Sequence, residues 1–345
     1  MLRHVEAHPA DISRMTAAYF QISRQLVARY LRRLVDEGQL EATGNTKDRR
    51  YRLKWFVDET FVVPVNPQLA EDVVWRTKVL ALLDGVPTNV VSMCQFGFTE
   101  IFNNAIEHAQ SQIIITGVRR NANLIEIRLT DMGVGIFNKI QQALTLSDPR
   151  HALLELAKGK LTTDPGGHTG EGIFFTSRMF DEFAILSGDL FFGATTGDEN
   201  WLVEVENREP RQGTMVSMEI STHSRRTTQE VFDKYAAPAA EYSFSRTHVP
   251  VKLARYGEEQ LVSRSQARRV LARFEKFQEV LLDFSGVETI GPAFADEIFR
   301  VYRQAHPEIK VLGIHMKPQI EEMVYKARRG LNESATTQIS RTDNN

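Results

Sequence analysis

The sequence predicts a multidomain α/β protein built from three unlike parts. Its 345 residues are enough for two or three domains, and a hydrophobic content of 42% is enough for several cores. Charge is uneven, because the first 55 residues hold 11 Lys and Arg against 6 Asp and Glu, whereas the whole chain carries −2. We expect domains at residues 1–57, 62–222 and 246–330, with a linker at 223–245 and a disordered tail at 331–345.

The composition argues against a secreted or membrane protein. The single cysteine, Cys94, lies in an apolar helical pattern, so we expect a buried side chain and no disulfide framework. We expect no membrane span and no signal peptide, since apolar runs are short and Arg3, His4 and Glu6 interrupt the first turns. The scattered histidines do not form a zinc constellation. A cytoplasmic protein with no membrane partner is therefore expected.

The amino-terminal segment has the pattern of two short helices and a hairpin. Residues 13–20 form the first expected helix, Ser23 is a typical N-cap for a second helix that extends to about Glu37, and Gly38 is expected to end it. A hairpin follows, and its tip spans residues 44–48. The excess of positive charge at this end of the chain indicates a polyanionic partner.

This segment resembles a winged helix-turn-helix, which implies that the partner is DNA. In that motif the second helix enters the major groove and reads bases, while the wing contacts phosphates. The alternative is a set of solvated charges on an interaction domain that does not bind DNA. Regulators of this kind often bind as dimers, so a homodimer is left open. The candidate DNA contacts are Arg24, Gln25, Arg29 and Arg32 on the helix and Lys47, Arg49 and Arg50 on the wing.

The central segment contains a helix with two polar residues four positions apart. Residues 96–109 read FGFTEIFNNAIEHA, in which apolar residues recur at helical spacing and Glu100 and Asn104 share one face. An Asn carbonyl beside a carboxylate that can orient water suits Mg²⁺ and nucleotide phosphates. The pair therefore favours nucleotide chemistry, although the chain lacks a Walker loop.

Two glycine-containing segments complete this pattern. An expected strand ends at Asp131, whose carboxylate can accept a hydrogen bond from the adenine amino group, and Gly133 and Gly135 let a flat base approach the backbone. Residues 166–172 form a glycine-rich loop that opens a helix, and such a loop presents N–H groups to phosphates. The order and spacing of the three segments predict an ATP site.

Residues 62–220 resemble the GHKL ATPases, which include gyrase, Hsp90, MutL and histidine kinases and share an α/β sandwich called the Bergerat fold. The resemblance implies ATP and Mg²⁺ as ligands, with Asn104 as the Mg²⁺ ligand and Glu100 as the catalytic base. It also implies that residues 136–169 form a mobile ATP lid. The residues implied to contact ATP are Asn104, His108, Asp131, Gly133, Gly135, Gly170, Gly172 and Thr214.

Within this group the spacing Glu-x-x-x-Asn-Ala-x-x-His most resembles the anti-sigma-factor serine kinases. Glu107 stands where sensor kinases often carry Lys, which argues against a sensor kinase. Some roles stay open: His108 either touches phosphate or only caps its helix. Lys158 and Lys160, in the expected lid, either reach the γ-phosphate or are solvated in an exposed loop.

The carboxy-terminal segment alternates strand, loop, helix and strand in the manner of a small α/β domain. Residues 280–284 and 309–316 are the expected strands, and residues 321–328 form a closing helix. Over residues 249–329 this segment resembles the STAS-like fold of anti-sigma-factor antagonists. Such antagonists are partners and substrates of the serine kinases that the central segment resembles.

The resemblance does not extend to the phosphorylated serine of those antagonists. Ala293 occupies the place where that serine is expected, and the hydroxyl residues Thr289 and Ser285 precede it. Phosphorylation in cis is therefore not favoured, and we expect this domain to serve as a docking module for a protein partner.

Two classes of function follow. In the first, a DNA-binding regulator of transcription couples ATP binding and slow hydrolysis of ATP to ADP and phosphate to a rearrangement of its modules. In the second, the protein is a serine/threonine kinase that acts on a separate STAS-type partner. A MutL-like DNA clamp ATPase is a further alternative, although the carboxy-terminal part does not resemble the transducer domain of that family.

Overall fold

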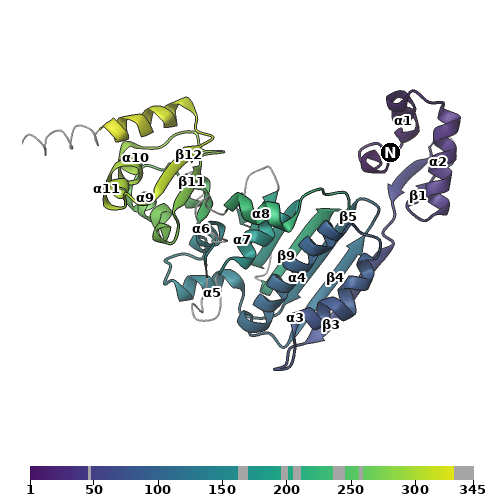
Figure 1. Ribbon diagram of the computed structural model, residues 1–345, viewed down its shortest axis with the longest axis horizontal. Coiled ribbons are helices and arrows are strands. Elements are labelled where there is room, and N and C mark those ends of the chain that lie inside the picture. The colour runs from purple at the N-terminus through teal and green to yellow at the C-terminus, as the bar shows by residue number, and fades with distance from the viewer. Residues whose placement is uncertain are drawn as a thin grey trace, which may run out of the picture.

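The chain forms a mixed α/β protein, seen in a computed structural model. An amino-terminal part, a large central sheet and a smaller carboxy-terminal part follow one another, and the first and last lie at opposite ends of the molecule (Figure 1). The structure describes residues 1–45, 48–161, 170–195, 201–204, 211–235, 245–255 and 259–329. Expectations for the glycine-rich stretch before Gly170 and for the tail at 331–345 lie outside these residues.

The amino-terminal part consists of short helices and a hairpin. Ser23 caps the second long helix, because its Oγ accepts a hydrogen bond from the Leu26 N–H at 3.2 Å. Gly38 follows that helix with a φ of +72°, a conformation that favours glycine. The elements are η1 (Leu2–His4), α1 (Ile12–Phe20), α2 (Arg24–Asp36), β1 (Leu40–Thr43) and β2 (Arg50–Leu53), and β1 and β2 pair antiparallel.

A seven-stranded antiparallel sheet forms the centre of the molecule. Its spatial order is β3-β4-β5-β9-β6-β7-β8, so β9 inserts between two strands that precede it by many residues. Strand β3 lies across the expected boundary between residues 57 and 62. The strands are β3 (Val57–Pro64), β4 (Ile113–Arg120), β5 (Leu124–Asp131), β6 (Glu182–Gly188), β7 (Leu190–Thr195), β8 (Trp201–Glu204) and β9 (Arg211–Ser221).

Helices pack on this sheet and extend from its edge. Helix α4 packs against α7, β5 and β9 through buried apolar residues such as Phe98 and Phe102, whose rings stack at 5.1 Å. The helices are α3 (Glu71–Val74), η2 (Trp75–Val79), η3 (Leu80–Leu83), α4 (Thr88–His108), α5 (Ile136–Ala143), α6 (His151–Lys158), α7 (Gly172–Met179) and α8 (Thr228–Tyr235). Among the described residues, no helix is long and apolar enough to cross a membrane.

The carboxy-terminal part contains a three-stranded parallel sheet in the order β10-β11-β12, with helices between the strands. The strands expected at residues 280–284 and 309–316 correspond to β11 and β12. A last helix covers residues 318–329. The other elements are β10 (Arg246–Pro250), η4 (Val251–Ala254), α9 (Arg264–Leu271), η5 (Phe274–Lys276), β11 (Glu279–Asp283), α10 (Pro292–Asp296), η6 (Glu297–Tyr302), α11 (Arg303–Ala305) and β12 (Lys310–Ile314).

The central and carboxy-terminal parts share one hydrophobic core, whereas the amino-terminal part has its own around Val27 and Leu31. Helix α6 belongs to the shared core, and all eight of its residues are buried. It packs against α5 and α7 on one side and against β10 and η4 on the other. The carboxy-terminal part is therefore docked onto the central part through this helix.

Candidate functional site

A cavity of about 350 Å³ opens between α4, β5, α5 and the start of α7. Residues from distant segments of the sequence line it together. Every residue expected to contact ATP is in this lining except Gly133. The expected residues that line the cavity are Glu100, Asn104, His108, Asp131, Gly135, Gly170, Gly172 and Thr214.

Asp131 is the most buried acidic residue of the cavity, with 7% of its surface exposed. It is the last residue of β5, and its Oδ1 accepts hydrogen bonds from the N–H groups of Gly133 at 2.9 Å and Thr214 at 3.2 Å. Burial raises the pKa of the Asp131 carboxyl, while the two N–H donors act in the opposite direction. The carboxylate is thus held in one orientation before any ligand binds.

The two glycines after Asp131 have different roles. Gly135 lines the cavity with a φ of +82°, and a Cβ added there would lie 2.7 Å from the Ser187 hydroxyl. Gly133 lies behind the cavity, where an added Cβ would lie 1.8 Å from the carbonyl oxygen of Ala109. Gly133 therefore lets the turn after β5 pack against the end of α4, which is a structural role.

Thr214 joins β9 to the rim of the cavity. Its Oγ1 accepts a hydrogen bond from the Ile136 N–H at 3.0 Å, which ties it to the first turn of α5. The preceding Gly213 has a φ of +86°, and an added Cβ would lie 2.1 Å from the Asp131 carbonyl oxygen. Ser187 donates a hydrogen bond to the Gly213 carbonyl at 2.8 Å, a support that the sequence motifs do not reveal.

Glu100 and Asn104 line the cavity one turn apart on α4. The Glu100 carboxylate lies against the first residue of α7, because a Cβ added to Gly172 would lie 2.0 Å from Glu100 Oε2. The start of a helix is electropositive and leaves N–H groups without helical partners, so it favours anions. The cavity therefore combines a carboxylate, an amide and a helix N-terminus at one end.

The cavity lining also includes Asn103, Lys139 and Glu171, which are not among the expected site residues. Lys139 on α5 donates a hydrogen bond from Nζ to the carbonyl oxygen of His108 at 2.8 Å. Burial lowers the pKa of the Lys139 amine. Lys139 therefore caps the carboxyl end of α4, and the signal in the sequence would have been a cation in the helix after the Asp-x-Gly-x-Gly turn.

Lys158 is not solvated in an exposed loop, and in the docked arrangement it does not line the cavity. Its side chain is fully buried, outside the cavity, and its Nζ donates to Glu155 Oε1 and to the carbonyls of Arg269 and Ala272. Lys160 also lies outside the cavity lining, and its Nζ donates to the Lys276 carbonyl at 2.9 Å. Within the expected lid, Lys158 and Lys160 are thus bonded to the carboxy-terminal part.

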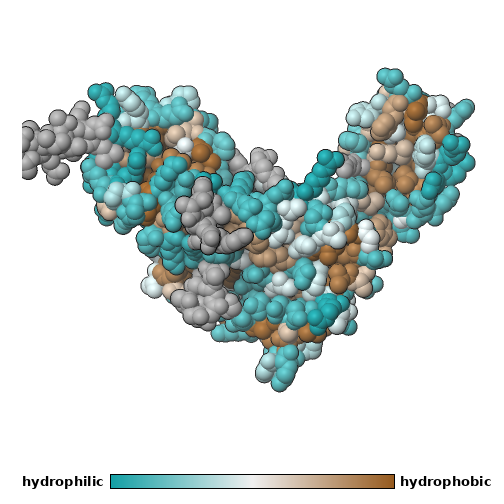
Figure 2. Space-filling view, in the orientation of Figure 1, coloured by the Kyte–Doolittle hydropathy of each residue, from teal (hydrophilic) through white to brown (hydrophobic). Residues whose placement is uncertain are grey.

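A second candidate surface lies on α2 and the β1–β2 hairpin. The candidate residues of α2 are exposed, and its outward side is hydrophilic in Figure 2. Arg33, on the same helix, is paired with Glu37 at 2.6 Å. Lys47 lies outside the described residues. The exposed candidates are Arg24, Gln25, Arg29, Arg32, Arg49 and Arg50.

Comparison with known proteins identifies one part of the chain. Residues 266–321 match a family described as a STAS-like domain of unknown function (DUF4325). The matched stretch covers most of α9 and all of β11, α10 and β12, so the carboxy-terminal part contains a STAS-like domain. No curated protein matches the chain.

Proposed function

We propose that the protein is a cytoplasmic, ATP-binding regulator of transcription. In this proposal the central part is a GHKL-type domain with the Bergerat fold, and the amino-terminal part is a winged helix-turn-helix that binds DNA. The observation that carries the proposal is the meeting of Glu100, Asp131, Gly172 and Thr214, which come from distant segments, in one cavity.

The Asp131 end of the cavity suits adenine. An ionised carboxylate only accepts hydrogen bonds, so it pairs with the amino group of adenine and disfavours the carbonyl that guanine carries at that position. The Gly133 and Thr214 N–H groups already fix the orientation of the Asp131 carboxylate. Binding of the base therefore costs little conformational entropy at this side chain. The backbone of Gly135 belongs to the cavity lining, so the base can lie against it.

The α7 end of the cavity suits the phosphates. The Gly172 turn supplies a helix N-terminus, and Lys139 supplies a cation to the cavity lining. Among the described residues, no group of three His, Cys, Asp or Glu side chains is placed to hold a metal ion. A Mg²⁺ ion would therefore take one ligand from the Asn104 carbonyl and most of the others from phosphate and water, as this ion commonly does.

Glu100 is the expected catalytic base. It lies one turn from Asn104 in the same cavity, so it is close to any phosphate that Asn104 contacts through an ion. From there its carboxylate could orient a water molecule and take a proton from it during hydrolysis of ATP to ADP and phosphate. We expect this hydrolysis to be slow or to depend on a partner.

A serine/threonine kinase is the second candidate, and the STAS-like match is the observation that favours it. A separate STAS-type protein is the expected substrate, because Ala293 lies in the first turn of α10 and has no hydroxyl. Docking of a protein partner through the STAS-like domain is compatible with either candidate.

A single strand connects the cavity with the amino-terminal part. Strand β5 ends at Asp131, and just before its start the Asn123 side chain donates a hydrogen bond to the Leu2 carbonyl at 2.9 Å. Few contacts therefore separate the cavity from the amino-terminal part along this strand. This proximity is a spatial argument for coupling between ATP binding and DNA binding. The exposed candidates of α2 and of the β1–β2 hairpin, together with Lys47, are the proposed DNA contacts, and a homodimer is compatible with them.

The test uses purified full-length protein and ATP labelled at the γ-phosphate. Calorimetry first measures ATP binding with and without Mg²⁺, and we expect binding that Mg²⁺ strengthens. Label that appears as free phosphate supports the ATPase, and label on an added STAS-type protein supports the kinase. Absence of ATP binding under both conditions would exclude the proposed function.

A further inference from the structure

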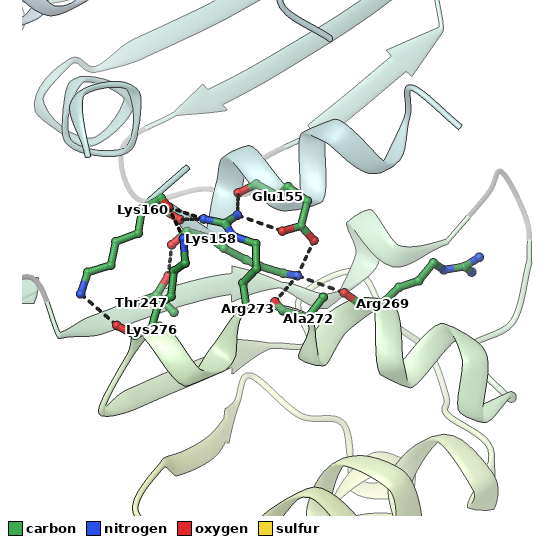
Figure 3. Close-up of polar contacts among 9 residues, drawn as sticks. Glu155, Lys158, Lys160, Thr247, Arg269, Ala272, Arg273 and Lys276 are labelled. Atoms are coloured by element: carbon green, nitrogen blue, oxygen red, sulfur yellow. Dashed lines mark hydrogen bonds and ion pairs between the residues drawn. The ribbon is translucent and has the colours of Figure 1, made fainter. Parts of the chain in front are cut away.

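The carboxyl end of helix α6 is completed by residues of the carboxy-terminal part. The last carbonyls of a helix have no partner within it and need donors from elsewhere. Here Thr247 on β10 donates from Oγ1 to the Lys158 carbonyl at 2.6 Å, and the Arg273 guanidinium donates to the carbonyls of Glu155 at 3.3 Å and Gly159 at 2.9 Å (Figure 3). The helix end is therefore held by the docked domain.

Side chains of α6 reinforce the same attachment. Lys158 points into the carboxy-terminal part, and its Nζ donates to the carbonyls of Arg269 at 3.0 Å and Ala272 at 2.9 Å (Figure 3). Glu155 bridges the two cations of this cluster, because it accepts from Lys158 at 2.6 Å and from Arg273 at 2.9 Å. The carboxylate and the amine are buried and the guanidinium side chain is only 13% exposed, so each depends on the others for its hydrogen bonds.

The same segment forms a wall of the cavity. Leu156 and Leu161, on either side of Lys158 in the sequence, line it. The Leu161 N–H donates to the Gly170 carbonyl at 3.0 Å, which links the end of the segment to the loop before α7. In the docked arrangement this wall is apolar, and the amines of Lys158 and Lys160 are bonded to the carboxy-terminal part.

We propose that the STAS-like part is an autoinhibitory clamp on the nucleotide site, which holds residues 151–161 through Thr247 and Arg273 and withholds Lys158 and Lys160 from the phosphates. This inference rests on the proposed ATP site and adds its regulation. Release of the clamp frees Lys160 and leaves Lys158 with Glu155 of the same helix as its remaining charged partner, so the freed segment keeps a net positive charge beside the cavity and ATP binds the undocked state more tightly. By reciprocity, ATP weakens docking by the same factor.

The test compares full-length variants of the clamp with a matched control. Arg273→Asn removes the guanidinium, and Asn is tolerated at the left-handed φ of +66° that residue 273 adopts. Thr247→Val removes only the hydroxyl and keeps the shape of a buried side chain. Arg264→Asn is the control, since Arg264 is exposed and pairs with Asp296 inside the carboxy-terminal part.

Two readouts separate the clamp from the ATP site itself. Hydrogen exchange at residues 151–161, without nucleotide, should be faster in both clamp variants than in the control. ATP affinity in calorimetry should rise about 5-fold or more, within the usual range of allosteric coupling. Unchanged exchange, or faster exchange with unchanged or weaker ATP binding, would refute the clamp while the ATP site stands. No ATP binding by any variant would refute both.

Discussion

The carboxylate of Asp131 is oriented by two backbone donors, and it is buried at the end of a strand. A carboxylate fixed in this way contributes to ligand binding mainly by accepting a hydrogen bond from the ligand. Glu100 is different, because its side chain lies against the start of α7 and near the amide of Asn104. At the scale of residues the two carboxylates should therefore separate binding from chemistry.

Asp131→Asn should largely abolish ATP binding. The amide presents a donor toward the adenine amino group, so a buried hydrogen bond becomes a clash between two donors, with a loss of roughly 2–4 kcal/mol. Calorimetry of ATP binding measures the loss. Asp58→Asn is the control, because Asp58 is an exposed carboxylate on β3. Wild-type affinity in Asp131→Asn would remove this residue from the site.

Glu100→Gln should keep ATP binding and lose turnover. The amide retains the shape that packs against Gly172, but it cannot take a proton, so hydrolysis should slow by about 10²–10⁴. Release of labelled phosphate under saturating ATP measures the effect, with Glu107→Gln, exposed on the same helix, as the control. A rate equal to that of the wild type would mean that Glu100 has a structural role only.

At the scale of elements, α6 and α2 differ in what surrounds them. Helix α6 is buried on all sides and has its carboxyl end completed by another part of the chain. Helix α2 buries Val27 and Leu31 against its own small core and leaves a basic face exposed. The stability contributed by α6 should therefore depend on pH through its buried charges. DNA binding at α2 should depend on the salt concentration.

The buried lysine of α6 predicts a rise of stability in alkaline solution. Burial lowers the pKa of Lys158 to about 8 from 10.5; nearby Arg273 also lowers it, while Glu155 and Glu275 oppose the shift. Between these values the unfolded chain binds more protons than the folded one, so the free energy of unfolding increases with pH. Burial raises the pKa of the Cys94 thiol and of the Tyr302 hydroxyl to about 12, so these groups act in the opposite direction at the upper end of this range. Urea unfolding from pH 8 to 10.5 should therefore show the contribution of Lys158 as the difference in slope between the wild type and Lys158→Met.

Lys158→Met should reduce that slope, because it removes the titrating group. Lys310→Met, at an exposed lysine of β12, should leave the slope unchanged. A slope that is equal in the wild type and in Lys158→Met would show that Lys158 does not titrate in this range.

The two kinds of proposed DNA-binding residue should respond differently to substitution. Replacing Arg49 and Arg50 by Ala should weaken binding to every sequence and reduce the salt slope by about 0.9 for each phosphate that is no longer neutralised. Replacing Arg24 or Gln25 should instead relax specificity, by about 1–3 kcal/mol for a bidentate bond to a base. Binding titrations at several salt concentrations distinguish these results. Identical effects of both sets would contradict the assigned roles.

At the scale of the whole molecule, local features were predictable and distant contacts were not. The Ser23 cap depends on residues three positions apart, and the Glu100 and Asn104 pair depends on one helical turn, so the sequence suffices for both. Bonds from the Lys158 amine to Arg269 and Ala272 join residues more than a hundred positions apart, and no local pattern encodes them. The docking of the segment around Lys158 onto the carboxy-terminal part was therefore not predicted from the sequence.

The glycines of the candidate site show the same limit of prediction from the sequence. A glycine motif predicts that a side chain would not fit at a position. It does not identify the neighbouring atoms with which the side chain would clash. Gly135 belongs to the cavity lining, and the Ser187 hydroxyl is the neighbour that a side chain there would meet, whereas at Gly133 it is the Ala109 carbonyl at the end of α4. Lys139 was missed because its partner, the His108 carbonyl, lies 31 positions earlier in the sequence, where no local pattern points to it.

ATP binding in the cavity and DNA binding at α2 are coupled in the proposed regulator. The most direct test selects DNA fragments with the full-length protein and then measures affinity for the selected DNA with and without MgATP. We predict that the two affinities differ, and that DNA changes the ATP affinity by the same factor, since coupling is reciprocal. Equal DNA affinity with and without ATP, in a protein shown to bind both, would contradict the account.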